Sequence, residues 1–136
     1  MAAERTILII DDDPLFVQAT TAVLQSRGYR VQSARNGEEG LAKMREYAPD
    51  LVLLDVMMGW LLEGITISRK MARDSRLRRI PLVMVTSIRN SEYQGALSQD
   101  EFLHIDGWLD KPCPSDRLIS VIEAVLAKRE TFAPKP

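Results

Sequence analysis

The chain reads TILIIDDDP from Thr6 to Pro14, and this stretch decides how the rest of the sequence is interpreted. Its first five residues have the length of a strand, and the absence of polar alternation predicts burial on both faces. Three aspartates follow, and Asp13 before Pro14 has the pattern of a helix N-cap with proline at the first helical position. The stretch therefore predicts a buried strand that turns directly into a helix.

The same pattern recurs along the chain. Apolar runs of strand length alternate with segments whose apolar residues repeat at helical spacing. Strands are predicted at residues 6–10, 29–34, 51–55, 82–87 and 107–110, and helices at 14–28, 37–47, 64–73 and 115–129, with a further short helix around 97–103. Because the strands are hydrophobic throughout, we expect an α/β fold: a doubly wound five-stranded parallel sheet with helices on both faces.

Composition and charge exclude several classes of protein. With 136 residues, the chain has the length of one domain with its own hydrophobic core. A net charge of −1 does not mark a nucleic-acid binder, and no apolar run reaches the roughly 20 residues that a membrane span needs. The single cysteine, Cys113, excludes an internal disulfide and a multi-cysteine zinc site. The N-terminus lacks the apolar region of a secretory signal, so we expect a cytoplasmic protein.

Polar residues stand where the predicted strands end. They are Asp11 and Asp12 after the first strand, Asp55 at the third, Thr86 at the fourth and Lys111 after the fifth. Parallel strands end at the same edge of a sheet, so these carboxylates would cluster there and require a cation. An all-oxygen cluster suits Mg²⁺ better than zinc. Lys111 and Thr86 are then placed to hold the oxygens of a phosphoryl group.

Asp55 is the expected nucleophile at this edge. Asp11 and Asp12 lie at a strand–helix turn, where they can serve as metal ligands. Asp55 stands alone at the end of the central strand and is predicted to face Lys111. Attack of its carboxylate on phosphorus, with departure of a leaving group, would give an acyl phosphate.

Four motifs carry a resemblance to a known family. They are residues 9–14 (IIDDDP), 53–58 (LLDVMM), 85–87 (VTS) and 110–112 (DKP), in this order and at nearly the family's spacing. Over residues 5–129 the chain resembles the receiver domain of bacterial two-component response regulators, and we expect residues 130–136 to form a flexible C-terminal tail. The resemblance implies a flavodoxin-like sheet with the strand order 2-1-3-4-5.

The resemblance also implies roles for individual residues. Asp55 would take a phosphoryl group from a sensor histidine kinase or a phosphotransfer protein. The metal, Mg²⁺, would be held by Asp12, Asp55 and the backbone carbonyl of Met57, and Asp11 would act through a water ligand of the metal. Three further features are implied: Thr86 and Trp108 as residues that move on phosphorylation, and a cis peptide between Lys111 and Pro112. For Trp108, simple packing at the sheet edge is an equal alternative.

Two loops depart from the family pattern. Residues 57–64 read MMGWLLEG, where the family commonly has a proline in place of Gly59 and a loop one residue shorter. The apolar residues 60–62 beside the phosphorylation site predict a lid or a partner contact. Residues 88–106 lack a periodic fourth helix, so the family's usual output face is not expected in its standard form.

Three other features have a plain and a functional interpretation. A basic cluster is formed by Arg69, Lys70, Arg73, Arg76, Arg78 and Arg79. A solvated helix end is favoured over phosphate-backbone binding, because Asp74 interrupts the cluster and no DNA-binding motif is present. His104 is expected to be structural and not a phosphocarrier. Cys113 is expected to be a small buried residue and not a reactive thiol.

The function expected from these observations is that of a single-domain response regulator. It would accept a phosphoryl group in the presence of Mg²⁺ and signal by contact with a downstream protein, without enzyme turnover, direct DNA binding or a membrane. One alternative is a pseudo-receiver that interacts without phosphorylation. Another is a metal-dependent phosphatase with an aspartyl-phosphate intermediate. Such enzymes generally need a second acid two residues beyond the nucleophile, where this chain has Met57.

Overall fold

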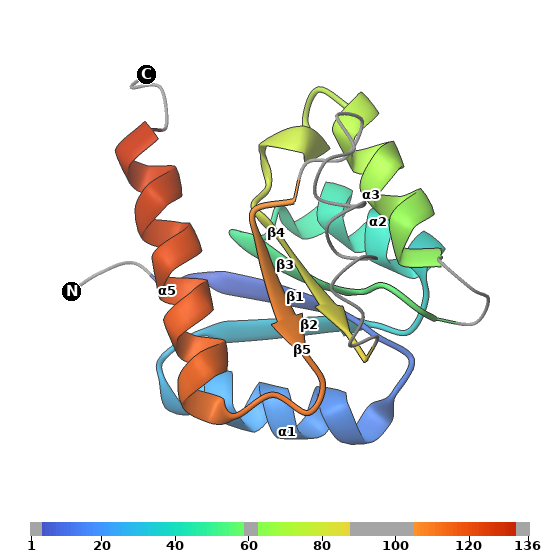
Figure 1. Cartoon of the computed structure of the whole chain (residues 1–136). Coiled ribbons are helices and arrows are strands. Elements are labelled where there is room, and N and C mark those ends of the chain that lie inside the picture. The colour runs from blue at the N-terminus through green and yellow to red at the C-terminus, as the bar shows by residue number, and fades with distance from the viewer. Residues whose placement is uncertain (1–3, 59–62, 88–104, 133–136) are drawn as a thin grey trace.

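Five parallel strands form the centre of the computed structural model, which describes residues 4–58, 63–87 and 105–132 (Figure 1). The strands are β1 (Thr6–Ile10), β2 (Arg30–Ala34), β3 (Leu51–Asp55), β4 (Leu82–Thr86) and β5 (Gly107–Asp110). Their order in the sheet is β2-β1-β3-β4-β5, and every neighbouring pair is parallel. The predicted fold class and strand order are confirmed. The order reverses between β1 and β3, which is where open parallel sheets bind ligands.

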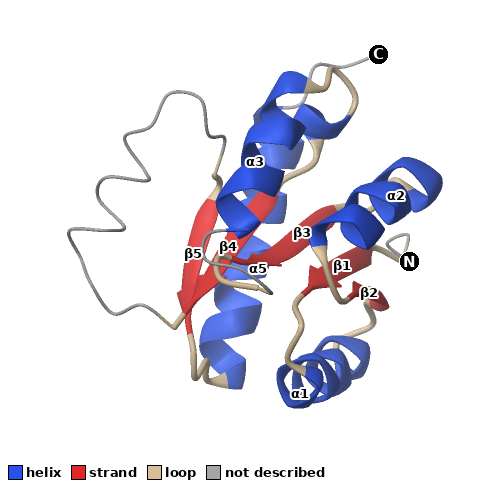
Figure 2. Cartoon of the chain, turned by 90° about the vertical axis from the view of Figure 1, so that its right-hand side faces the viewer, coloured by secondary structure: helices blue, strands red, loops and turns tan. Residues whose placement is uncertain are grey.

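Helices cover both faces of this sheet (Figure 2). The helices α1 (Pro14–Ser26) and α5 (Ser115–Phe132) lie on one face, and α2 (Gly37–Tyr47) and α3 (Glu63–Arg73) lie on the other. Alternate residues of β1 serve the two faces, because Ile7 and Ile9 pack with the first helix pair while Leu8 and Ile10 pack with the second. This two-sided burial explains why β1, β3 and β4 show no polar alternation, whereas β2 (RVQSA), at the edge of the sheet, is only partly buried and contains polar residues.

Side-chain caps fix the starts of α1 and α2. Asp13 caps α1, because its Oδ1 accepts hydrogen bonds from the backbone N–H groups of Leu15 at 3.0 Å and Phe16 at 3.4 Å. Asn36 caps α2 by accepting from the N–H of Glu39 at 2.9 Å. Both predicted N-caps are confirmed, and each places the start of its helix beside the carboxyl end of the preceding strand.

Two elements differ from the sequence prediction. Helix α5 continues to Phe132, so residues 130–132, which were expected in a flexible tail, are helical. The physical reason is the absence of a stop signal, since no glycine or proline follows Ser115 before Pro134. A short 3₁₀ helix, η1 (Leu77–Arg79), joins α3 to β4 and was not predicted.

Several predictions fall on residues that the structure does not describe. These are the short helix at 97–103, the structural role of His104, the apolar residues 60–62, and the end of the tail at 133–136. Within the described ranges, no helix combines the length and the apolar character that crossing a membrane requires.

Candidate functional site

The carboxyl ends of β1, β3, β4 and β5 bring the predicted site residues to one edge of the sheet (Figure 1). Because β1 and β3 pair in parallel, Asp11 and Asp55 lie side by side at the ends of these strands. On the other side of β3, the backbone N–H of Lys111 donates to the carbonyl of Thr86 at 2.8 Å, which ties the end of β5 to the end of β4. The topology alone therefore assembles the site from distant parts of the sequence.

The turn between β1 and α1 fixes the first two aspartates. The carboxylate of Asp11 is buried, and its Oδ1 accepts a hydrogen bond from the N–H of Asp13 at 2.9 Å. The N–H of Asp11 donates to the carbonyl of Ala34 in the neighbouring β2 at 3.0 Å. Asp12 follows with an exposed side chain. One short turn thus presents a buried and a solvent-facing carboxylate to the same edge.

Asp55 is a buried carboxylate at the end of the central strand. The residue is 5% exposed, and its Oδ1 accepts a hydrogen bond from the N–H of Met57 at 3.1 Å. Burial raises the pKa of Asp55 to about 6, and the negative charge of Asp11 adds to this effect. The positive charge of Lys111 and the hydrogen bond from Met57 oppose it only in part. A negative charge on Asp55 therefore needs further compensation.

Lys111 supplies a positive charge between the two buried carboxylates. Its Nζ lies 2.8 Å from Asp11 Oδ2 and 3.5 Å from Asp55 Oδ2. Burial by itself lowers the pKa of Lys111, but the hydrogen bond to Asp11 and the charges of Asp55 and Asp11 outweigh burial and hold this pKa above its ordinary value. The ammonium also lies 4.5 Å from the centroid of the Phe16 ring. Lys111 is therefore charged at neutral pH.

Asp11, Asp12 and Asp55 form an acidic cluster with the donor set of a hard divalent cation. One carboxylate oxygen from each residue lies within 4.8 Å of those of the other two. Carboxylates at this spacing repel one another, and burial together with the charge of Asp11 keeps the pKa of Asp55 raised in spite of Lys111. Carboxylate oxygens with solvent access on one side fit Mg²⁺, which retains several of its water ligands. The roles of the individual ligands, including the carbonyl of Met57, stay predictions.

The two predicted switch residues lie on one face of the sheet. Thr86 ends β4 and is buried, and Trp108 in β5 lies opposite Met84 in the strand register. Trp108 is half-buried and packs against the apolar cluster beneath α2 and α3. Met84, the partner of Trp108, precedes Thr86 by two residues in β4. Trp108 therefore lies diagonally from Thr86 on the same face of the sheet, further from the carboxyl ends of the strands. Movement of either residue stays a prediction. The peptide between Lys111 and Pro112 is cis, as the resemblance implied.

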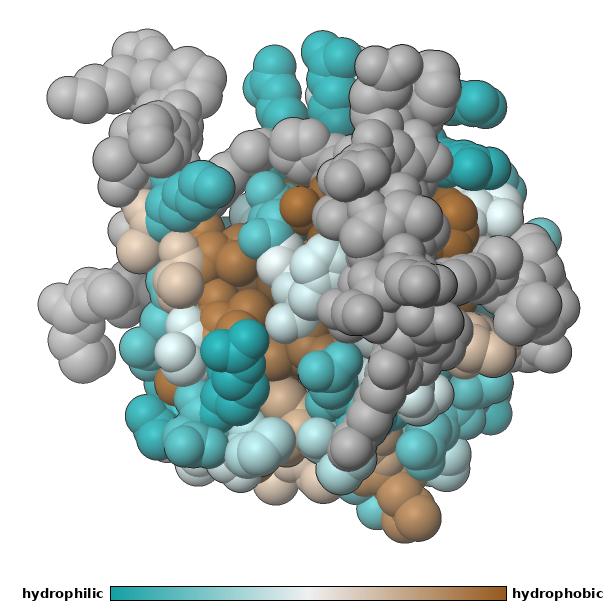
Figure 3. All heavy atoms as spheres, in the orientation of Figure 1, coloured by the Kyte–Doolittle hydropathy of each residue, from teal (hydrophilic) through white to brown (hydrophobic). Residues whose placement is uncertain are grey.

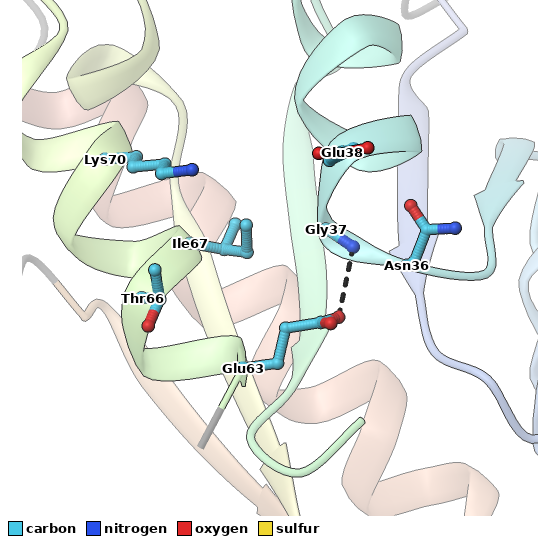
Figure 4. A pocket seen from close by; sticks show the side chains of 7 residues that line it. All are labelled: Asn36, Gly37, Glu38, Glu63, Thr66, Ile67 and Lys70. Carbon is cyan, nitrogen blue, oxygen red and sulfur yellow. Dashed lines mark hydrogen bonds between the residues drawn. The ribbon is translucent and has the colours of Figure 1, made fainter. Parts of the chain in front are cut away.

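A pocket of about 310 Å³ lies between α2 and α3 (Figure 4). It is lined by Asn36, Gly37, Glu38, Glu63, Thr66, Ile67 and Lys70. At its base, Oε2 of Glu63 accepts a hydrogen bond from the N–H of Gly37 at 3.2 Å (Figure 4). The carboxylate thus satisfies an N–H group of the first turn of α2, which has no partner within the helix. This bond ties the start of α3, which follows the loop after Asp55, to the start of α2.

Gly64 brings the far end of that loop back to β3. Its N–H donates to the carbonyl of Val56 at 3.0 Å, and a Cβ atom built on Gly64 would lie 2.1 Å from the carbonyl oxygen of Asp55. Only glycine fits this close approach without moving the backbone of Asp55. Sequence reasoning identified neither this contact nor the roles of Glu63 and Phe16. For Phe16, its place in the first turn of α1 beside three aspartates was an available signal.

The basic cluster lies on the surface near the end of α3 and around η1, and all six of its side chains are exposed. Hydrophilic side chains project there from the top of the molecule (Figure 3). The interrupting acid, Asp74, accepts hydrogen bonds from the N–H groups of Arg76 at 2.8 Å and Leu77 at 3.1 Å, and it lies 3.7 Å from Nη2 of Arg45. Asp74 therefore has a structural role at the start of η1.

Cys113 lies just beyond the site and is half-buried. Burial raises the pKa of the Cys113 thiol. A raised pKa lowers the fraction of thiolate at neutral pH, which favours the predicted packing role over a reactive one.

Comparisons with known proteins agree with this geometry. The model of the response regulator receiver domain family matches residues 7–123. Protein PilH of Pseudomonas aeruginosa is 34% identical over 121 residues, which are 89% of this chain and 97% of PilH. The DNA-binding dual master transcriptional regulator RpaA of Synechocystis is 32% identical over 126 residues, which cover 91% of this chain and 50% of RpaA.

Solved structures show the same relationship. The crystal structure of a CheY-like response regulator receiver domain protein from Methanospirillum hungatei superimposes with a TM-score of 0.82 at 27% identity, and the match covers 95% of this chain and 98% of that one. Receiver domains are phosphoacceptors that bind Mg²⁺ at an acidic pocket, and the strand order and acidic cluster of this chain agree with that description. The chain belongs to the response regulator receiver domain family.

Proposed function

We propose that Asp55 is the phosphoacceptor of this receiver domain and that its phosphodonor is the phosphohistidine of a sensor kinase or a phosphotransfer protein. The observation that carries the proposal is the position of the Lys111 ammonium, 2.8 Å from Asp11 Oδ2 and 3.5 Å from Asp55 Oδ2. A buried carboxylate beside a fixed ammonium can approach an anionic phosphoryl group, because the ammonium offsets the repulsion between them.

The reaction requires Asp55 as the carboxylate. One of its oxygens attacks the phosphorus atom, the bond between phosphorus and the imidazole nitrogen breaks, and the electron pair of that bond stays with the histidine. The Lys111 ammonium is placed to bind a phosphoryl oxygen, and Thr86 ends the adjacent strand, where its hydroxyl can donate to another. When bound at the acidic cluster, Mg²⁺ supplies positive charge that offsets the repulsion between the carboxylates and the phosphoryl group. Asp11, Asp12 and Asp55 would hold it, together with the carbonyl of Met57.

The proposed output is a change in affinity for another protein. The match to PilH over 97% of that protein's length supports an output through a separate molecule. The match to half of RpaA shows that the same kind of domain also occurs in a longer DNA-binding protein, so the nature of the output is part of the proposal. Phosphotransfer from a sensor kinase would place the protein in the cytoplasm. The slow hydrolysis expected of a switch agrees with Met57 standing where a phosphatase of this type needs an acid.

Labelling with a small phosphodonor tests the proposal. The chain is incubated with Mg²⁺ and radiolabelled acetyl phosphate, and the label is followed after gel separation together with its loss in hydroxylamine, which cleaves acyl phosphates. We expect the wild-type chain to be labelled, Asp55→Asn to be unlabelled, and chelation of the metal to prevent labelling.

A matched control is Asp116→Asn, which removes an exposed carboxylate in the first turn of α5. This variant should be labelled at the wild-type rate. Equal labelling of Asp55→Asn would overturn the assignment of Asp55. A wild-type chain that takes no label from acetyl phosphate or from any sensor kinase would instead favour the phosphorylation-independent alternative.

A further inference from the structure

We propose that Phe16 is a positioning residue for Lys111, and that the face of its ring holds the ammonium where the phosphoryl group arrives; this inference rests on the proposed function. The ammonium lies 4.5 Å from the ring centroid, within the range of a cation–π interaction. Phe16 belongs to no recognised motif of the site and was not predicted from the sequence.

The turn that carries the aspartates also fixes Phe16. Asp13 caps α1 and accepts a hydrogen bond from the N–H of Phe16, so the aromatic residue is held in the first turn of the helix. Its ring is partly buried and packs against the apolar cluster that α1 and α5 form with the sheet. Because the backbone and one side of the ring are fixed, the other side can act as a rigid surface for a neighbouring group. Lys111 from the end of β5 occupies that position.

The uncharged ring of Phe16 has a chemical advantage over a carboxylate as a partner for the Lys111 ammonium. The ammonium is attracted by Asp11 Oδ2 at 2.8 Å and Asp55 Oδ2 at 3.5 Å. A metal ion at the acidic cluster would draw on the same carboxylates, and phosphorylation would convert the carboxylate of Asp55 into an acyl phosphate. The metal weakens both ion pairs that hold Lys111, and phosphorylation replaces the carboxylate charge of Asp55 by that of the phosphoryl group, so the charged partners of the ammonium change. The ring of Phe16 is unaffected by either event, because it carries no charge and binds no metal.

A third carboxylate in place of the ring would be counterproductive. It would compete with the phosphoryl oxygens for the ammonium and repel the incoming donor. The aromatic face attracts a cation through its quadrupole and adds no net negative charge. Burial of the lysine side chain, which is 18% exposed, strengthens this attraction relative to one in open solvent. Phe16 therefore orients Lys111 without opposing the reaction.

The sharpest test replaces Phe16 by phenylalanines carrying one, two or three ring fluorines. These analogues keep the shape of the side chain while they progressively weaken the negative potential of the ring face. The rate of labelling by acetyl phosphate at fixed Mg²⁺ should fall stepwise along the series. The variant Phe16→Leu, which keeps apolar packing and removes the ring, should be slower by about three- to tenfold, and Phe16→Tyr should stay close to wild type.

A second measurement reads the contact directly. The ring current of Phe16 should shift the NMR signals of the Lys111 side-chain methylene groups upfield in the wild-type chain, and this shift should disappear in Phe16→Leu. The packing control is Val23→Ala, which removes a partly buried side chain of α1 from the same apolar cluster at a site away from Lys111. This variant should lose stability and keep the wild-type rate of labelling.

The outcomes separate the inference from the proposed function. Labelling of the wild-type chain with a rate that follows the number of fluorines supports the inference. Equal rates across the fluorinated series overturn it and leave the proposed function intact. Absence of the upfield shift in the wild-type chain also overturns it. A wild-type chain that is never labelled overturns the proposed function, and with it any positioning role in phosphotransfer.

Discussion

The two charged regions at the ends of α3 differ in how their charges are arranged. The loop before α3 leads back to the acidic cluster, where Asp11 and Asp55 are buried around one ammonium. The far end of α3 leads into the basic cluster, whose side chains are all exposed to water. Water screens the exposed charges, whereas the buried ones must be balanced by protein groups, protons or metal.

This difference explains why the two regions have different chemistry. Burial raises the pKa of Asp55 to about 6, with a contribution from Asp11. Charges at this edge are therefore sensitive to any added cation or anion, which is the property that a phosphorylation switch needs. The basic cluster carries more charges, but these charges are exposed to water, so the interaction energy of each one with its neighbours is small.

The largest effect is expected for Lys111→Met, which leaves Asp11 and Asp55 without their shared cation. We expect the free energy of unfolding without metal to fall by about 2–4 kcal/mol at neutral pH, because two buried carboxylates then face each other. Mg²⁺ should restore most of this loss and should bind more tightly than to the wild-type chain, since it no longer competes with the ammonium. Urea unfolding with and without Mg²⁺ measures both effects.

The matched control for this variant is Lys128→Met, in an exposed position of α5. It should change the free energy of unfolding by less than about 0.5 kcal/mol. A loss in Lys111→Met as small as that of the control would contradict the view that the edge depends on this ion pair.

The second effect concerns pH. Because the folded pKa of Asp55, about 6, lies above its ordinary value of 3.8, the folded chain binds this proton more tightly than the unfolded chain does. The contribution of Asp55 to stability without metal is therefore fully present below about pH 4 and is lost as the pH rises through about 6. Mg²⁺ competes with the same proton, so its affinity should rise by up to about tenfold per pH unit below pH 6 and level off above it.

Titration of Mg²⁺ at several pH values, followed by tryptophan fluorescence or calorimetry, measures this dependence. In Asp55→Asn the steep part of the dependence should be absent. A constant Mg²⁺ affinity between pH 5 and 7.5 in the wild-type chain would show that the pKa of Asp55 is not raised in the folded chain.

The third effect concerns a buried polar group without compensation. Ser68 in α3 is 1% exposed, and within the described residues its Oγ has no hydrogen-bond partner. Ser68→Ala should therefore raise the free energy of unfolding by about 1 kcal/mol, since it removes an unsatisfied hydroxyl and improves helix propensity. The control is Ser26→Ala, where the exposed hydroxyl donates to the carbonyl of Val23. Chemical unfolding should show a gain in the first variant and none in the second.

The smallest effect is expected in the basic cluster. Arg78→Gln removes one exposed charge, and the free energy of unfolding should change by less than about 0.5 kcal/mol at physiological salt. The rate of labelling by acetyl phosphate should be unchanged. A large loss of stability would mean that the cluster is not simply solvated, and the comparison with the acidic cluster would need revision.

The sheet and the acidic edge could be predicted because both depend on patterns that are local in sequence. The strands that carry the site are short and mainly apolar, and polar residues such as Asp11, Asp55 and Lys111 stand at their ends, whereas β2 (RVQSA) follows neither pattern. Parallel topology then brings strand ends together without further information. The N-caps of Asp13 and Asn36 were predictable for the same reason, since a cap and its helix are adjacent in the chain.

The remaining features depend on contacts that no local pattern records. The contact between Phe16 and Lys111 needs the direction of a side chain from α1 and the position of one from β5. The bond from Gly37 to Glu63 joins two helix starts 26 residues apart. The helix η1 is too short for a periodic signal. These features arise from tertiary packing, so a sequence read segment by segment does not contain them.

The contacts of Gly64 have a consequence for how much the loop before it can vary. Its hydrogen bond to Val56 and its close approach to Asp55 join the two ends of the loop at their base. Lengthening a closed loop is inexpensive in entropy, at about 0.6 kcal/mol for each doubling of its length. A reporter peptide inserted in this loop can therefore be accommodated. New partner specificity can evolve or be engineered there while the chemistry at the sheet edge is preserved.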